Sequence, residues 1–177
     1  GTLHTLTEGE NTWVFDEEEG TLTLNPPSGT TYASWIAGFF PDDTTNPAIV
    51  GPNADPDKDG VSNALELVFG GNPKDTMNAD LMPKIALVTN PGGTVPDGDY
   101  LRLTYRRSSA STTAGMTTIA EYDRDLNAPW TSATDGVDGV VIITTENGFA
   151  AGIDKVETFI ARGSLSTIFG RVKATVP

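Results

Sequence analysis

The chain has 177 residues, of which 37% are hydrophobic, enough for one core of ordinary size. Its formal net charge of −13 argues against nucleic acid as a partner and favours cations. No apolar run is long enough to span a bilayer, so we expect no membrane insertion. Cysteine is absent, which excludes disulfides, so a divalent ion is an alternative means of stabilising the fold. The chain opens with Gly1 rather than Met, so we expect a piece of something longer.

Residues 1–27 predict a strand followed by a hairpin. An acidic turn at Asp16–Gly20 separates Trp13–Phe15 from Thr21–Leu24. Alternating apolar and polar residues around a glycine-containing turn are typical of a β-hairpin. Pro26–Gly29 then breaks the pattern. We interpret this part as the end of a preceding repeat region.

Residues 30–80 predict a helix, a calcium loop and a second helix. The first helix covers Tyr32–Phe40, where apolar residues recur at helical spacing until Pro41 stops it. Residues 42–59 are expected to form a loop rich in proline. The second helix is expected to begin at Ser62 or Asn63, which are both good N-cap residues, and to end at the stop that Gly70-Gly71 supplies before Pro73.

Residues 81–177 predict a series of antiparallel strands. Short stretches of apolar and polar alternation are separated by turns rich in Gly, Asp and Asn, one of them at Asn147-Gly148. The expected strands are Lys84–Val88, Tyr100–Arg106, Thr117–Tyr122, Val140–Thr145, Val156–Ala161 and Ile168–Val176. The whole chain is therefore expected to be mostly β: an antiparallel β-sandwich (Ig/FnIII-like or jelly-roll-like) with two short helices and one EF-hand-like calcium loop, in one compact module.

The segment from Asp55 to Glu66 has the residues that an EF-hand-type calcium loop requires. Such a loop needs oxygen ligands at positions 1, 3, 5, 9 and 12, a backbone carbonyl at position 7 and Gly at position 6. Gly60 occupies position 6, where it permits the sharp turn. The expected Ca²⁺ ligands are Asp55, Asp57, Asp59, the Val61 carbonyl, Asn63 and Glu66.

Three further acidic residues flank this loop. Asp42, Asp43 and Asp75 are close to it in sequence. They either complete the coordination, hold a second ion or cap turns. Position 8 of the loop is Ser62, where paired EF-hands carry an aliphatic residue, and no second complete loop exists in the chain. We therefore expect a lone structural site rather than half of a sensor pair.

The calcium loop and the residues after it resemble a known family. Asp55–Glu66 followed by Phe69–Pro73 is similar to the "DPDGDGLSNLLEYALGGDP" signature, which is related to thrombospondin type 3 and dockerin calcium repeats. That signature occurs near the C-termini of large secreted proteins of the Verrucomicrobia and Planctomycetes group. The strand Tyr100–Arg107 and the closing strand Phe169–Val176 fit the same family, so the resemblance covers roughly residues 30–177. It implies a C-terminal accessory module, a calcium ion and an extracellular or cell-surface location.

No catalytic constellation is apparent in the sequence, so we expect no enzyme activity. The single histidine, His4, lies in the N-terminal strand, and no cysteine nucleophile is present. Trp130, after Pro129 in an expected loop, is the best candidate for an exposed ligand-binding ring.

Three functions from different classes follow from these observations. The first is a non-catalytic calcium-binding accessory module of a secreted or cell-surface bacterial protein, which serves anchoring, sorting or structure. The second is a carbohydrate-binding module, and the third is a subunit of an extracellular fibre assembled through edge strands. The expected partners are the calcium ion and either the rest of a larger parent protein or a surface polysaccharide.

Overall fold

The N-terminal part forms a small antiparallel sheet of its own. The fold is taken from a computed structural model that describes residues 2–8, 11–18, 20–25, 31–127 and 129–177. Strands β1 (Leu3–Glu8), β2 (Asn11–Asp16) and β3 (Thr21–Asn25) pair in the order β1-β2-β3. The expected hairpin is therefore present, and the first strand joins it as a third. The expected break at Pro26–Gly29 lies outside the described residues.

Three helices follow in the segment that contains the acidic loop. Helix α1 (Tyr32–Phe39) begins at Thr31, whose side chain and that of Ser34 form a reciprocal capping box. Helix α3 (Asn63–Phe69) begins at the N-cap Ser62 and ends at Gly70, which adopts the left-handed conformation. Both predicted helices are thus confirmed. The short helix α2 (Pro47–Val50) was not expected, since a single turn leaves no periodic pattern.

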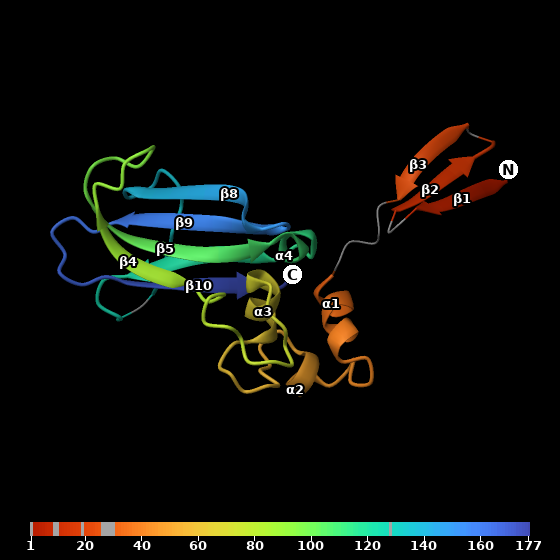
Figure 1. The fold of residues 1–177 in the computed structure, drawn as a ribbon, viewed down its shortest axis with the longest axis horizontal. Coiled ribbons are helices and arrows are strands. Elements are labelled where there is room, and N and C mark those ends of the chain that lie inside the picture. The colour runs from red at the N-terminus through yellow and green to blue at the C-terminus, as the bar shows by residue number, and fades with distance from the viewer. Residues whose placement is uncertain (1, 9–10, 19, 26–30, 128) are drawn as a thin grey trace.

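Two antiparallel sheets form the β-sandwich that was predicted (Figure 1). The larger sheet has the order β4-β5-β9-β8, with β4 (Lys84–Thr89), β5 (Asp99–Ser108), β9 (Ile153–Ala161) and β8 (Val140–Ala150). The smaller sheet has the order β10-β6-β7, with β10 (Phe169–Thr175), β6 (Thr117–Asp123) and β7 (Thr131–Ser132). All six expected strands are present, and the two-residue strand β7 is added to them.

Two further features differ from the expectation. Helix α4 (Ser109–Thr113) follows β5 directly, so the described part of the chain has four short helices rather than two. Strand β8 continues to Ala150, whereas Asn147-Gly148 was expected to be the turn. Asn147 adopts a positive φ of 52° within a register shift between Thr145 and Ala150, so it forms an irregularity inside the β8–β9 hairpin.

The core of the sandwich extends into the helical segment. Leu101 and Leu103 on β5 are almost fully buried, and Gly170 on β10 lies against both of them. A Cβ at Gly170 would lie 2.7 Å from Leu103 Cδ1, so the glycine lets the two sheets approach. Helix α3 adds Leu67, Val68 and Phe69 to the same buried cluster, and it lies beside one end of the strands (Figure 1). The acidic loop at the start of α3 is therefore held on a rigid support.

Candidate metal centre

The acidic loop is closed at its base by the backbone. The N–H of Asn63 donates to the carbonyl of Ala54 at 2.9 Å, and the N–H of Ala64 donates to the carbonyl of Pro52 at 3.0 Å. These bonds bring the first turn of α3 next to the residues that precede the loop. The chain between them, residues 55–62, must therefore curl back on itself.

Two residues with positive φ produce this curl. Lys58 has a φ of 64° and Gly60 a φ of 90°. A left-handed conformation disfavours a side chain with a Cβ, so Lys58 is a strained position that the surrounding structure must hold. The curled backbone directs the N–H groups of Asp59 and Gly60 toward Asp55. The two carboxylate oxygens of Asp55 accept hydrogen bonds from them at 3.2 and 2.9 Å.

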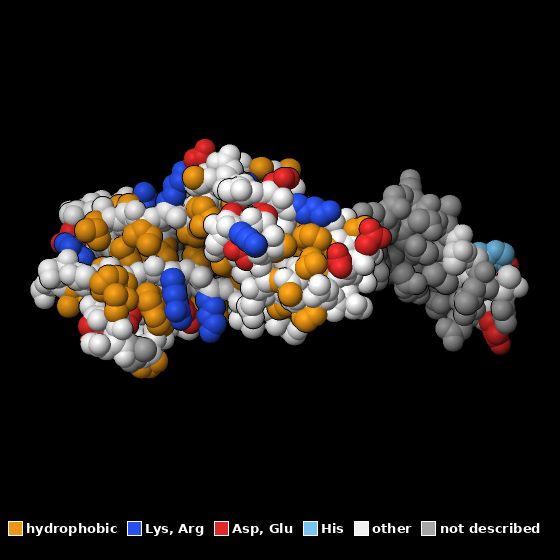
Figure 2. Space-filling model, turned by 90° about the horizontal axis from the view of Figure 1, so that it is seen from below, with side chains coloured by type: hydrophobic (Ala, Val, Ile, Leu, Met, Phe, Trp, Pro, Cys, Tyr) orange, Lys and Arg blue, Asp and Glu red, His pale blue; other side chains and the backbone are white. Residues whose placement is uncertain are grey.

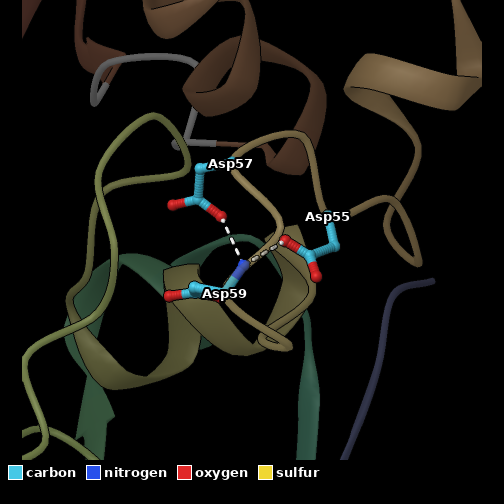
Figure 3. Close-up of side chains that lie close together, drawn as sticks. All are labelled: Asp55, Asp57 and Asp59. Atoms are coloured by element: carbon cyan, nitrogen blue, oxygen red, sulfur yellow. Dashed lines mark hydrogen bonds between the residues drawn. The ribbon is translucent and has the colours of Figure 1, made fainter.

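The curl gathers the three aspartates. One carboxylate oxygen from each of Asp55, Asp57 and Asp59 lies within 4.8 Å of the others. Figure 3 shows the three residues close together, with one oxygen of Asp55 and one of Asp57 directed at the backbone N–H of Asp59. Asp57 Oδ1 accepts from the N–H of Asp59 at 3.3 Å. The pKa of Asp57 is raised by burial and by repulsion from Asp59 and Asp55. Burial also acts to raise the pKa of Asp55, but hydrogen bonds, first that from the Gly60 amide, outweigh it and lower the pKa.

Glu66 is close enough to the three aspartates to feel their charge, but it does not belong to the group whose carboxylate oxygens lie within 4.8 Å of one another. Its side chain is 1% exposed, and neither carboxylate oxygen has a hydrogen-bond partner among the described residues. Burial, with repulsion from Asp59, Asp57 and Asp55, raises its pKa to about 7. A buried carboxylate without a partner is costly, and a bound cation is the usual compensation. The residues present thus fit a metal ion with hard oxygen ligands.

Val61 and Asn63, the other two expected ligands, have different surroundings. Val61 places its side chain in the core and donates its N–H to Asp59 Oδ1 at 2.7 Å. The Asn63 amide nitrogen donates to the carbonyls of Ile49 and Gly51 at 2.7 and 2.9 Å. Asn63 therefore ties α3 to α2, and its buried Oδ1, which has no hydrogen-bond partner within the described chain, is the atom left for a ligand.

The segment after α3 completes the centre, and sequence reasoning missed its role. Glu66 Oε2 lies so close to Gly71 that a Cβ there would be 2.2 Å away. The N–H of Met77 donates to Asp59 Oδ2. Gly71 was interpreted only as part of a helix stop. Since Gly70 alone provides the left-handed cap, the second glycine was a signal of close approach.

The flanking acids lie outside this cluster of aspartates. Asp42, Asp43 and Asp75 are exposed, and none of them belongs to the group that could share an ion among the described residues. Asp75 accepts a hydrogen bond from the Asn72 amide at 2.6 Å, within a tight turn. This environment fits the turn-capping alternative for Asp75.

Trp130 is half-buried rather than openly exposed. The guanidinium of Arg171 lies over its ring, with Cζ 4.3 Å from the ring centroid. Arg171 in turn binds the buried carboxylate of Glu121 at 2.6 Å. One face of the ring is thus covered by the protein's own side chain. Sequence reasoning missed this because Trp130 and Arg171 lie far apart along the chain.

Comparisons with known proteins found no relative. No protein-family model, no curated protein and no solved structure matches the chain. No helix among the described residues is long and apolar enough to cross a membrane. The fold and the site therefore define the class on their own: a mostly-β sandwich with an acidic loop whose three aspartates could hold a metal ion.

Proposed function

We propose that residues 55–66 bind one Ca²⁺ ion, and that the chain is a non-catalytic, calcium-stabilised accessory module of a secreted or cell-surface bacterial protein. The observation that carries the proposal is Glu66, which has two buried carboxylate oxygens without a hydrogen-bond partner in the described chain. Oxygen ligands alone, in a curled loop, suit a hard cation. Asp55, Asp57, Asp59 and Glu66 would hold the ion, with the Val61 carbonyl and Asn63 as the neutral ligands.

Calcium is favoured over magnesium by the number of oxygens that the loop offers. Ca²⁺ takes six to eight oxygen ligands in a flexible arrangement, whereas Mg²⁺ demands octahedral geometry and retains water. Single loops of this kind in extracellular modules bind calcium at about 10⁻⁴–10⁻³ M. An affinity in that range would suit the millimolar calcium outside cells, so the extracellular or cell-surface location is part of the proposal and the titration below tests whether the affinity agrees with it. Anchoring, sorting and surface structure are the roles that a rigid module would serve there.

The test compares unfolding in calcium and in EDTA. When the ion is at about 100 times its dissociation constant, binding should add about 2.7 kcal/mol to the free energy of unfolding. Glu66→Gln keeps the shape of the side chain but removes its charge, so we expect it to abolish most of this gain. In EDTA the same variant should be at least as stable as the wild type, because a buried charge has been removed.

Asp42→Asn is the matched control. It removes one negative charge from an exposed residue outside the cluster of aspartates, and should leave the calcium effect intact. Isothermal titration of both variants with Ca²⁺ and with Mg²⁺ measures the affinity directly. A melting temperature of the wild type that is the same in calcium and in EDTA would refute the proposal.

A further inference from the structure

A groove runs between the acidic loop and strand β10. It has a volume of about 380 Å³. One wall is formed by Asn53, Ser62, Ala64 and Leu65, and the other by Arg171–Ala174. Ser62 is the N-cap of α3, yet its side chain makes no capping bond, so the helix does not use its hydroxyl. The groove is separate from the carboxylates that face the metal.

The groove follows the free edge of β10. Successive side chains of a strand point to opposite faces, so a wall made of four consecutive residues must include the strand edge itself. In the described sheet β10 has β6 as its one neighbour. The opposite edge therefore has backbone N–H and C=O groups that no strand pairs with, over about 13 Å for four residues.

The rim of the groove is basic. The side chains of Arg171 and Lys173 are 48% and 54% exposed and share the carboxylate of Glu121. Two cations thus face one anion, which leaves a local positive charge on a chain of net charge −13. Glu121 and the ring of Trp130 hold Arg171 in place. Figure 2, seen from the side on which β10 and α3 lie, shows basic side chains beside exposed apolar ones.

We propose that this groove binds an extended acidic peptide segment, which adds to β10 as an antiparallel or parallel strand. The free edge supplies the main-chain hydrogen bonds, and the exposed cations select for acidic side chains. Val172 and Ala174 pack against the core but are only half-buried, and the surface that they leave in the groove offers apolar contact to alternate residues of the peptide. The occupant is thus a segment of a partner protein rather than a sugar or a second metal ion.

Calcium should strengthen this binding, and that part of the proposal rests on the proposed function. Asp55, Asp57, Asp59 and Glu66 belong to the same loop and helix as Ser62, Ala64 and Leu65, which line the groove, so their ionised carboxylates add negative charge to this part of the chain. A bound Ca²⁺ would offset two of these charges and so reduce the repulsion of an acidic peptide. Because the free edge of β10 exists without the ion, peptide binding without calcium dependence would refute this coupling and leave the groove assigned, whereas the metal site is tested separately by unfolding in calcium and in EDTA.

The experiment is an NMR titration of the ¹⁵N-labelled chain with a synthetic peptide of alternating Val and Asp. One control peptide has Lys in place of every Asp, and another is N-methylated at alternate residues so that it cannot pair as a strand. We expect amide shifts at Phe169–Thr175 and Ser62–Leu65, with the Asp peptide alone. Lys173→Gln should weaken the affinity about two- to fivefold, as expected for an exposed ion pair.

Lys84→Gln is the matched control, since Lys84 is an exposed lysine on β4, the edge strand of the other sheet. It should leave the affinity unchanged. Equal binding of the Lys peptide, shifts at β4 instead of β10, or no shift at millimolar peptide would each overturn the proposal. Sedimentation would detect self-association of the chain. If the chain self-associates through this groove and the Asp peptide does not bind, the occupant of the groove is a second copy of the chain and the proposal is overturned.

Discussion

The acidic segment and the core of the sandwich both contain fully buried side chains, but these differ in what surrounds them. In the core, Leu101 and Leu103 are surrounded by other apolar side chains. Ser108, which is buried at the end of the same strand, donates its hydroxyl to the carbonyl of Leu67 at 2.6 Å. In the loop, by contrast, both Glu66 oxygens and Asp57 Oδ2 are buried without a hydrogen-bond partner in the described chain.

This difference separates two kinds of stability. The core is stabilised by removal of apolar surface from water, which needs no further molecule. The loop concentrates negative charge that a bound cation or a proton can offset, so its contribution depends on the solution. If the proposed ion binds, the loop should become more rigid in calcium while the sheets remain folded with or without it. The two regions should then respond separately to mutation, pH and calcium.

The largest expected effect belongs to the core. Leu103→Ala should lower the free energy of unfolding by about 2–5 kcal/mol, because it removes a side chain that is 0% exposed and leaves a cavity. The loss should be the same in calcium and in EDTA, since Leu103 is packed among apolar side chains and offers no oxygen ligand to an ion. Urea denaturation followed by tryptophan fluorescence measures both values.

Leu87→Ala is the control for this substitution. Leu87 lies on the neighbouring strand β4, is 62% exposed and should cost about 0.5 kcal/mol or less. If the loss caused by Leu103→Ala were much smaller in EDTA than in calcium, the core and the loop would be coupled, and the comparison drawn above would fail.

Features that depend on a local pattern could be predicted from the sequence, and contacts between distant segments could not. The ligand pattern of Asp55, Asp57 and Asp59 was visible because it is local, and the cap at Gly70 and the alternation of β5 were visible for the same reason. Contacts between distant segments were not visible. Neither the approach of Glu66 to Gly71 nor the Met77 amide on Asp59 leaves a periodic signal, and single turns such as α2 are too short to show one.

The second effect is the change of stability with pH, which should have opposite signs for the acidic loop and for the sandwich. The pKa of Glu66 is raised from 4.5 to about 7, so without calcium the folded state retains a proton that the unfolded state releases. Stability should therefore fall by about 3 kcal/mol as the pH rises through this window. In the sandwich, the hydrogen bond from Arg107 lowers the pKa of Asp154, so its contribution is present above pH 3.8 and is lost as the pH falls below that value.

Calcium should reverse the dependence between pH 4.5 and 7, because the ion binds the ionised carboxylates and competes with the proton. Thermal unfolding in EDTA and in calcium across this range is the measurement. Glu66→Gln should flatten both profiles, and Asp42→Asn should leave them as in the wild type. A wild-type profile in EDTA that rises with pH would show that Glu66 is not the group that titrates.

The smallest expected effect comes from adding one methyl group, by a glycine-to-alanine substitution, in the acidic loop region or in the sandwich core. Gly71→Ala places a Cβ 2.2 Å from Glu66 Oε2 and 2.5 Å from Met77 Cε, so the carboxylate must move. We expect the affinity for calcium to fall about tenfold, equivalent to about 1.4 kcal/mol. The loss of stability in EDTA should be smaller than for an added group in the sandwich core, because both atoms that the Cβ meets are the far ends of flexible side chains.

Two further glycine substitutions serve as controls for Gly71→Ala. Gly170→Ala introduces a Cβ 2.7 Å from Leu103 Cδ1, so it should lower stability by about 1–3 kcal/mol and leave calcium affinity unchanged. Gly38→Ala on α1 meets no atom within 4 Å, and should leave calcium affinity unchanged while stabilising the helix slightly. Calorimetric titration and urea denaturation of all three variants decide the matter. If Gly71→Ala binds calcium as the wild type does, Glu66 does not need its present position, and the metal centre cannot depend on it.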